Sequence, residues 1–482
     1  MSLSQKGFSG FTYNFSSTII NKAIIFGGSI YIARLLTPDD YGLVAMLFII
    51  FAVSSALIKG GLGLALIREK EITEADKTTV FYFNIIVSIL LYLILWFAAP
   101  SISTFYERNE IIVLTRLMGL ELLFASLTIV QVSILNRELK FKALGVISVI
   151  SGIGVIITSI FLAYFGYGVI ALAVKFVLGS LLSSIMLFTY NPWLPKGFIK
   201  KSSFKKLFSF GSNVMLLGLV NNISKNLHQV VIGKYFETAS LGFFNQGKML
   251  QTNVISTFND TVMTVTFPLL SKLQNDKKRL KSAYQRIMQI NSFTIFPSIT
   301  ILIITAEPLI LALLGEKWSG SIVFLQILAI SGYVMHLHRI NLNVLKVYGK
   351  GKDYLLQGIF RNGLTILGII IAVNISVIAM AWAFVITEFL QLFINVYYSN
   401  KYIKFNFKEQ LKIIVPILLL ALSMGLFVYL ISLYDFQIQI LKFIVLSSSG
   451  MVYYLLMAYL FKMKALDEIM SLIGSKFKSS KK

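Results

Sequence analysis

Long apolar stretches alternate with short polar connections along almost the whole chain. Because a bilayer core about 30 Å thick needs about 20 helical residues and offers no water to unpaired backbone groups, each stretch predicts a membrane-spanning helix. The fourteen stretches lie at 13–33, 41–66, 78–99, 111–135, 143–164, 168–190, 207–233, 240–271, 287–306, 321–345, 353–374, 377–398, 409–432 and 436–461. The pattern predicts an all-α integral membrane protein with 14 transmembrane helices and no inserted soluble domain.

The composition and the placement of charge agree with a membrane protein. Hydrophobic residues make up 56% of the chain and the mean hydropathy is +0.78, above the roughly 45–50% apolar usage of soluble domains. Lys and Arg residues outside the spans, counted together with Lys412 at the start of the span 409–432, divide 31 to 4 between the two sides, which predicts that both termini are cytoplasmic. The net charge of +23 is spread over successive loops. This spacing predicts contact with anionic lipid headgroups and argues against a nucleic-acid groove.

An internal repeat is visible at an offset of 200 residues. The segment Ile32–Leu36 before Gly42 aligns with Ile232–Phe236 before Gly242. Six predicted spans separate the copies, and an even number preserves orientation, so we expect parallel repeats about a pseudo-twofold axis along the membrane normal. The expected organisation is a six-helix lobe 1–190, a cytoplasmic linker 191–206, a second six-helix lobe 207–400, two carboxyl-terminal helices within 401–461 and a cytoplasmic amphipathic basic tail 462–482.

Polar faces on two spans that correspond in the repeat predict a wet central cavity. At 100° per residue, span 207–233 gathers its amides, a lysine and a histidine within about 160°, and span 13–33 has a similar face. Such faces cannot point at lipid. Amides suit sugar hydroxyls, since both groups donate and accept hydrogen bonds. The expected sugar contacts are Asn21, Asn221, Asn222, Asn226, Gln229 and Asn253.

Nine lysines and arginines lie more than four residues from either end of a predicted span, against three acids at such positions. Ionisable groups at membrane depth are costly, and ammonium and guanidinium groups suit phosphate oxygens. The bases expected to bind a pyrophosphate are Lys22, Lys225, Arg339 and Arg361, together with Arg116 and Lys175, for which simple packing fits equally well. The remaining bases, Lys59, Lys248 and Lys442, lie toward span ends, where snorkelling explains them at least as well.

The three acids Asp260, Glu121 and Glu388 are candidates to couple transport to a proton or sodium ion. Asp260 comes first, because it lies at helical spacing on a polar stripe that begins at Asn253, where water can reach it. The alternative is that Asp260 only neutralises a nearby base. His336 and His338 are expected to pack or to line a cavity mouth, since no third metal ligand lies near them. No metal and no other cofactor is expected.

The run Ala33–Gly42 resembles the signature of polysaccharide-export flippases in the multidrug/oligosaccharidyl-lipid/polysaccharide (MOP) exporter superfamily. Three further segments are similar to that group: Asn136–Phe141, Leu241–Asn245 and Phe267–Ser271. The likeness covers nearly the whole chain and is strongest to the Wzx-type branch of colanic-acid and teichuronic-acid exporters.

The resemblance implies an inverted V of two lobes and a flippase that works by alternating access. Its substrate would be an undecaprenyl-pyrophosphate-linked oligosaccharide, moved from the inner to the outer leaflet of the bacterial cytoplasmic membrane for O-antigen, capsule or exopolysaccharide synthesis. It further implies ion-gradient coupling, a monomer, and polysaccharide polymerase and chain-length proteins as partners.

Two alternatives are open. A membrane enzyme of polysaccharide assembly needs an acid/base or nucleophile cluster, but the loops show only pairs such as Asp39 and Asp40, which fit a helix cap, and the chain has no cysteine. With no P-loop to hydrolyse ATP, energy must come from a gradient or the membrane potential. A small-cation drug exporter of the same superfamily predicts an acidic or apolar cavity, whereas the buried charge here is basic.

Overall fold

The computed structural model describes residues 24–470, except for the side chains of 213, 214, 217, 221, 257–269, 271 and 272. Within this range the fold is entirely helical. The first helices are Ile24–Leu35, α2 (Pro38–Lys59), α3 (Leu62–Arg68), α4 (Glu74–Tyr106), α5 (Glu110–Arg137), α6 (Phe141–Tyr164), α7 (Val169–Tyr190) and α8 (Lys201–Tyr235). Those that follow are α9 (Thr238–Lys272), α10 (Lys277–Ile304), α11 (Ala306–Leu313), η1 (Glu316–Trp318), α12 (Gly320–Ile330), α13 (Gly332–Val347), α14 (Gly351–Val373), α15 (Val377–Ile403), α16 (Phe407–Ser432) and α17 (Gln439–Leu460).

The protein is a multi-pass membrane protein. Among the described residues, 10 helices are long and apolar enough to cross a membrane, or 11 if α12 and α13, which bend by 41°, form one span. The predicted spans 207–233 and 240–271 correspond to α8 and α9, which include side chains that the structure does not describe and are not among the helices counted. The predicted span 13–33 begins outside the described residues. The total of fourteen therefore stays a prediction.

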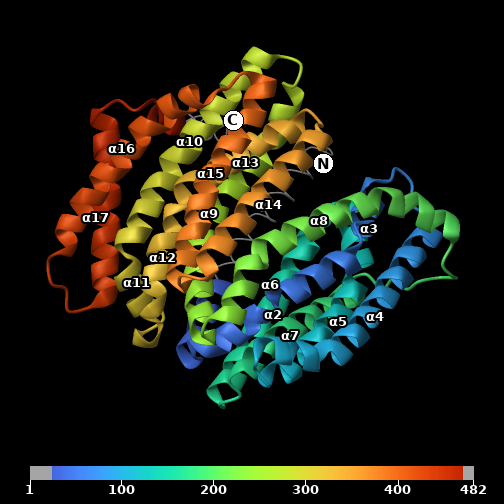
Figure 1. The fold of residues 1–482 in the computed structure, drawn as a ribbon. Coiled ribbons are helices and arrows are strands. Elements are labelled where there is room, and N and C mark those ends of the chain that lie inside the picture. Colours follow the sequence, from blue (N-terminus) through green and yellow to red (C-terminus); the bar gives the residue numbers. More distant parts are fainter. Residues whose placement is uncertain (1–23, 471–482) are drawn as a thin grey trace. The chain divides into compact units, whose positions relative to one another are not determined.

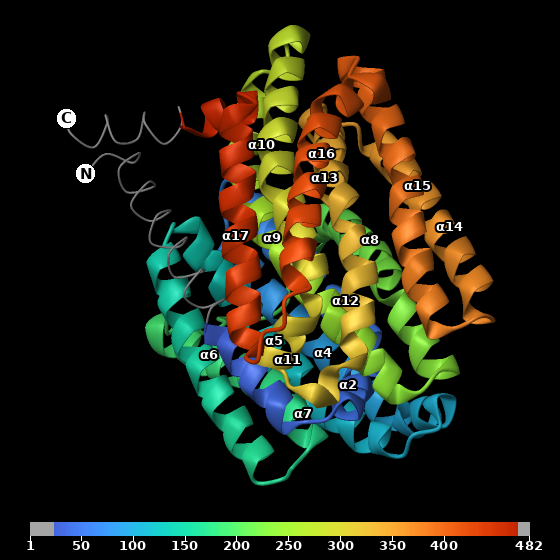
Figure 2. The same cartoon turned by 90° about the vertical axis from the view of Figure 1, so that its left-hand side faces the viewer.

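The chain divides by its internal contacts into two compact units, with the division after Gly242. In the first unit, α4 packs along α5, and α8 packs along α2 (Figure 1). In the second unit, α14 lies beside α15 and α16 beside α17 (Figures 1 and 2). The helix α8 therefore groups with the helices that precede it. The transport lobes predicted to divide at 191–206, and their inverted V, stay a prediction.

The segment Ala33–Gly42 begins α2 with a cap that its sequence specifies. Thr37 precedes the helix, and its hydroxyl accepts a hydrogen bond from the backbone N–H of Asp40 at 3.3 Å. The Asp40 carboxylate in turn accepts from the backbone N–H of Thr37 at 2.8 Å, which completes a capping box. Pro38 occupies the first turn, where its missing N–H has no helical partner to lose. Asp40 thus has the capping role expected for this acidic pair.

Two glycines that correspond in the repeat make reciprocal close contacts. A Cβ atom on Gly42 would lie 2.0 Å from the carbonyl oxygen of Thr238, and one on Gly242 would lie 1.9 Å from that of Pro38. The repeat offset of 200 residues relates Pro38 to Thr238 and Gly42 to Gly242. Each glycine therefore contacts the residue that corresponds to the partner of the other glycine. A parallel twofold repeat predicts such a pair of contacts where its copies meet. The backbones approach so closely because glycine has no side chain.

Charged residues between α4 and α5 bind the start of α2 and the start of α9. Arg108 donates to Asp39 at 2.7 Å, to Glu110 at 3.1 Å and to the hydroxyl of Thr238 at 3.0 Å. The two carboxylates raise the pKa of Arg108, which therefore stays charged. Arg108 thereby joins the start of α2 to the start of α9, next to the reciprocal glycine contacts.

Arg137, at the end of α5, caps α3. Its guanidinium donates to the backbone carbonyls of Leu66 at 2.8 Å, Ile67 at 3.2 Å and Lys70 at 3.0 Å, and also to that of Glu69. The last carbonyls of a helix have no partner inside the helix, and a cation there also complements the helix dipole. Arg137 thereby holds the short helix α3 against α5.

We expect Arg137→Gln to lower the stability of the detergent-solubilised protein by about 2 kcal/mol, because charge-assisted hydrogen bonds to four carbonyls are lost. Thermal unfolding followed by light scattering should show the lower transition. Arg279, whose side chain is 79% exposed, provides the matched control. Arg279→Gln should melt like the wild type, and equal melting of both variants would contradict the capping role.

The core of the second unit lies between α10, α13, α16 and α17 and extends to the tail. Residues 464–470 form a further helical segment, in which Leu466 and Ile469 pack against this core. The first residues of the predicted apolar face of the tail, Leu466 and Ile469, therefore pack against the core of the second unit. Ile473 and Phe477, which would continue that face, lie outside the described residues.

Candidate substrate site

Polar side chains form matching stripes on α14 and α15, two helices that pack side by side. Residues at spacings of three and four share one helix face, so each stripe is continuous. Gln357, Arg361 and Thr365 lie on α14, and Glu388, Gln391 and Asn395 lie on α15. The stripes meet: Gln391 accepts from Nε of Arg361 at 2.9 Å and donates to Thr365 at 3.0 Å.

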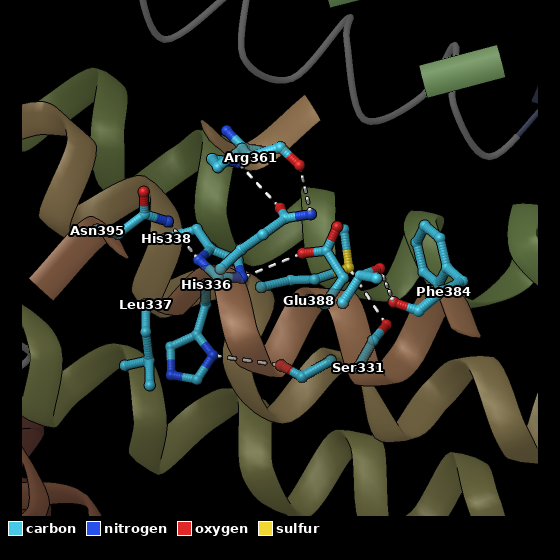
Figure 3. A network of polar contacts seen from close by, with 12 residues as sticks. Ser331, His336, Leu337, His338, Arg361, Phe384, Glu388 and Asn395 are labelled. Carbon is cyan, nitrogen blue, oxygen red and sulfur yellow. Dashed lines mark hydrogen bonds and ion pairs between the residues drawn. The ribbon is translucent and has the colours of Figure 1, made fainter. Parts of the chain in front are cut away.

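His338 on α13 joins the stripe of α15. Its Nε2 lies 3.0 Å from Oε2 of Glu388, and its Nδ1 is bonded to the side-chain amide of Asn395 (Figure 3). Gln357 donates to Oδ1 of Asn395, which leaves the amide nitrogen of Asn395 facing His338. An amide N–H can only donate, so Nδ1 of His338 accepts, and the ring proton lies on Nε2. His338 thereby carries its N–H on the nitrogen that lies next to Glu388, although the pair does not have hydrogen-bond alignment.

The site around Glu388 carries more positive than negative groups. His338, Arg361 and Lys248 of α9 are the described groups that act on its charge, and α10, α12 and α16, which are near α15, add none. The ammonium of Lys248 lies 5.3 Å above the ring of Phe384, which directs it toward α15. Among the described residues, Arg361 donates a single side-chain hydrogen bond, to Gln391. A guanidinium has five N–H groups, so most of this donor capacity is free for an anion.

The neighbouring polar residues His336 and Asn341 of α13 have hydrogen-bond partners inside the protein. His336 is fully buried and contacts the hydroxyl of Ser292 at 2.9 Å. Asn341 donates to Gln410 at 3.1 Å and accepts from Ser399 at 2.6 Å. Buried polar groups need such partners. Within the described residues no three His, Asp or Glu side chains are placed to hold a metal ion.

A second candidate site lies in the first unit, where a cavity of about 420 Å³ opens between α5, α6 and α7. Glu121 and Lys175 both line it, and the ammonium of Lys175 donates to Ser29 at 3.1 Å. Four hydroxyls complete its polar lining, those of Ser148, Ser151, Ser180 and Ser183. The structure therefore brings together two residues that the sequence had assigned to separate roles.

The matches to known proteins identify the family. A family profile described as "Polysaccharide biosynthesis protein" matches residues 31–323, more than half of the chain. The chain belongs to this family. The family membership confirms the resemblance to polysaccharide-export proteins that the segment Ala33–Gly42 indicated.

Individual members and folds agree with this family. The teichuronic acid biosynthesis protein TuaB of Bacillus subtilis is 25% identical over 77% of this chain and 78% of its own length. The succinoglycan biosynthesis transport protein ExoT of Rhizobium meliloti is 24% identical over 70% of each chain. The structure of the lipid II flippase MurJ in an inward closed conformation superposes with a TM-score of 0.79 at 19% identity, covering 93% of this chain and 98% of that one. These matches place this chain among transporters rather than enzymes.

The predicted phosphate-binding bases lie in different surroundings. Arg361 belongs to the α14–α15 cluster, and Lys175 lines the cavity of the first unit. Arg116 lies 4.5 Å from the ring of Trp96, a cation–π contact that favours packing. Lys225 on α8 and Arg339 on α13 are exposed. Lys22 lies outside the described residues.

The predicted sugar contacts and coupling acids are also separated. Asn222 donates to the carbonyl of Ala52 at 3.3 Å and so bridges α8 to α2, while Asn226 donates to the carbonyl of Asn222 at 2.8 Å. Gln229 is buried and Asn253 is exposed. Asn21 and the side chains of Asn221 and Asp260 lie outside what the structure describes. The sugar-binding and coupling roles of all these residues stay predictions.

The partners of Glu388 were not predicted from the sequence. His338 was expected to pack or to line a cavity mouth, and snorkelling explained Lys248 at least as well as binding. Gln391 and Asn395 had no predicted role. A signal was present in the spacing: Glu388, Gln391 and Asn395 repeat at intervals of three and four, as do the polar residues of α14. Matching stripes on consecutive spans favour a polar interface between them.

Proposed function

We propose that this chain is a flippase that moves undecaprenyl-pyrophosphate-linked oligosaccharides from the inner to the outer leaflet of the cytoplasmic membrane. The family match, the names of its relatives and the MurJ-like fold support a transporter of lipid-linked polysaccharide precursors. The observation that supports an anionic substrate is the cluster around Glu388, where one carboxylate lies 3.0 Å from His338 and is influenced by the charges of Arg361 and Lys248. A pyrophosphate supplies the negative charge that this excess of donors lacks.

Alternating access is the proposed mechanism, with energy from an ion gradient or the membrane potential. The amides and hydroxyls near the bases would contact the sugar, and the cavity that holds Glu121 and Lys175 is a second polar surface for it. A drug exporter for small cations is less compatible, because a cation entering the cluster around Glu388 would meet Arg361 and Lys248. Which oligosaccharide is carried depends on sugar contacts that await testing.

The function is tested with purified protein in liposomes that contain a fluorescent undecaprenyl-pyrophosphate-linked disaccharide. We expect the protein to bring the sugar to the far leaflet, where added periodate or a lectin detects it. Deleting the gene in its host should stop polysaccharide export and accumulate the lipid-linked precursor. Liposomes that translocate no faster than protein-free ones, with normal export in the deletion strain, would contradict the proposal.

A further inference from the structure

Glu388 holds the groups that an incoming phosphate would need. The chain Gln357 to Asn395 to His338 puts the ring proton of His338 on Nε2, and this nitrogen lies 3.0 Å from Oε2 of Glu388 without the alignment of a hydrogen bond. Arg361 and Lys248 act on the same carboxylate from α14 and α9. The side chain of Glu388 is only 13% exposed, so water screens these interactions weakly. Without substrate, the carboxylate is the counter-ion of the cluster.

We propose that substrate phosphate displaces Glu388 from these cations and that Glu388 takes up one proton when it does so. The inference rests on the proposed function and adds the residue that links substrate binding to a proton. Two anions that share one cationic site cannot both remain charged at low cost, so the group that is the weaker acid becomes protonated. The proton comes from water that reaches the cluster and forms the neutral carboxyl group of Glu388. When the phosphate leaves, the proton returns to water.

The geometry gives each partner a role in this exchange. Nε2–H of His338 can donate to the Glu388 carboxylate or to a phosphate oxygen without changing tautomer, because Asn395 keeps Nδ1 occupied. Among the described side chains, Arg361 bonds to Gln391 through Nε alone, which leaves its two terminal nitrogens for a bidentate phosphate contact. Gln391 itself is anchored by Thr365, so Arg361 keeps its position while the anion changes.

A direction of coupling follows from this linkage. Because the proton binds together with the phosphate, it crosses with the substrate, and a pH gradient that is acidic outside would not accelerate export. The electrical potential, negative inside, would still move the remaining negative charge of the pyrophosphate outward. The proposal therefore assigns the driving force to the membrane potential rather than to the proton gradient.

The experiment measures proton uptake when undecaprenyl pyrophosphate binds to the full-length protein in lipid nanodiscs. Calorimetry in two buffers of different ionisation enthalpy gives the number of protons taken up per ligand. We expect the wild type to take up one proton more than Glu388→Gln near neutral pH, since protons bound by the ligand itself are common to both proteins. For the wild type, the affinity should fall by up to tenfold more per unit rise in pH than for the variant.

Two further variants make the result decisive. Asp353→Asn removes a carboxylate that pairs with Lys401 at 2.7 Å on the same two helices, and it should keep the wild-type proton number. If Glu388→Gln does not fold, infrared difference spectra of the wild type should show a protonated-carboxyl band on ligand addition, and Glu388→Asp should shift that band. Binding with equal proton uptake in wild type and variant, or no such band, would overturn the role of Glu388 alone. Absence of wild-type binding at every pH would overturn the proposed function as well.

Discussion

Gly42→Ala or Gly242→Ala should eliminate most of the folded, export-competent protein. The added methyl carbon would lie 2.0 Å from the backbone oxygen of Thr238 in the first variant and 1.9 Å from that of Pro38 in the second. Backbone cannot rotate away as a flexible side chain can, so the ends of α2 and α9 would have to separate, at a cost of about 3 kcal/mol or more. Size-exclusion chromatography of the detergent-solubilised variants and export in a deletion strain would measure both losses.

Gly358→Ala is the matched control for these variants. Gly358 lies in α14, and a Cβ atom there would have nothing within 4 Å. Alanine is the better helix former by about 1 kcal/mol, so this variant should fold at least as well as the wild type. Wild-type behaviour of Gly42→Ala and Gly242→Ala alike would mean that the two helix ends are not in the close contact described here. A loss in one variant only would argue against the twofold relation between the contacts.

Arg361→Gln should abolish polysaccharide export while the protein is inserted at its normal level. The variant loses the charge and the bidentate contact that the guanidinium offers to phosphate, and two charge-assisted hydrogen bonds correspond to a loss of affinity of about 100-fold or more. Arg361→Lys should be intermediate, because it keeps the charge but not the planar fork or the bond to Gln391. Binding of undecaprenyl pyrophosphate to the purified variants and export in the deletion strain measure the effect.

Arg279→Gln provides the control here as well, since the side chain of Arg279 is 79% exposed and distant in the sequence from the cluster. It should bind and export like the wild type. Full export by Arg361→Gln at normal membrane levels would exclude Arg361 from substrate binding and would remove the main support for a phosphate site at α14 and α15.

The elements of the fold could be predicted from local sequence. The helices that the structure shows to be apolar enough to cross a membrane coincide with predicted spans, because burial of about 20 consecutive apolar residues in lipid depends on each segment alone. The cap of α2 was also readable, since Thr37, Pro38 and Asp40 act within one helical turn. By contrast, α8 and α9 are not among the helices counted in the described part of the chain, and the membrane placement of 207–233 and 240–271 stays a prediction.

Only some residues of the candidate site could be predicted from the sequence. Arg361 and Glu388 were recognised as intramembrane charges because each is costly in lipid whatever surrounds it. For Lys248 the sequence left snorkelling at least as good an explanation as a role in binding, and in the structure its ammonium lies 5.3 Å from the ring of Phe384. Depth in a span does not fix the direction of a long side chain, so the sequence could not decide between the two.

The sequence by itself determined that the chain is a helical, multi-pass membrane protein of the polysaccharide-export type, with a basic excess inside its spans and a repeat at an offset of 200 residues. Hydropathy, capping and family motifs are properties of short segments, so they need no knowledge of the fold. Only the tertiary structure decided that His338 faces Glu388, 50 positions away, and that Glu121 and Lys175 share one cavity. Such pairs depend on how each helix is rotated against its neighbours, and packing between helices sets that rotation.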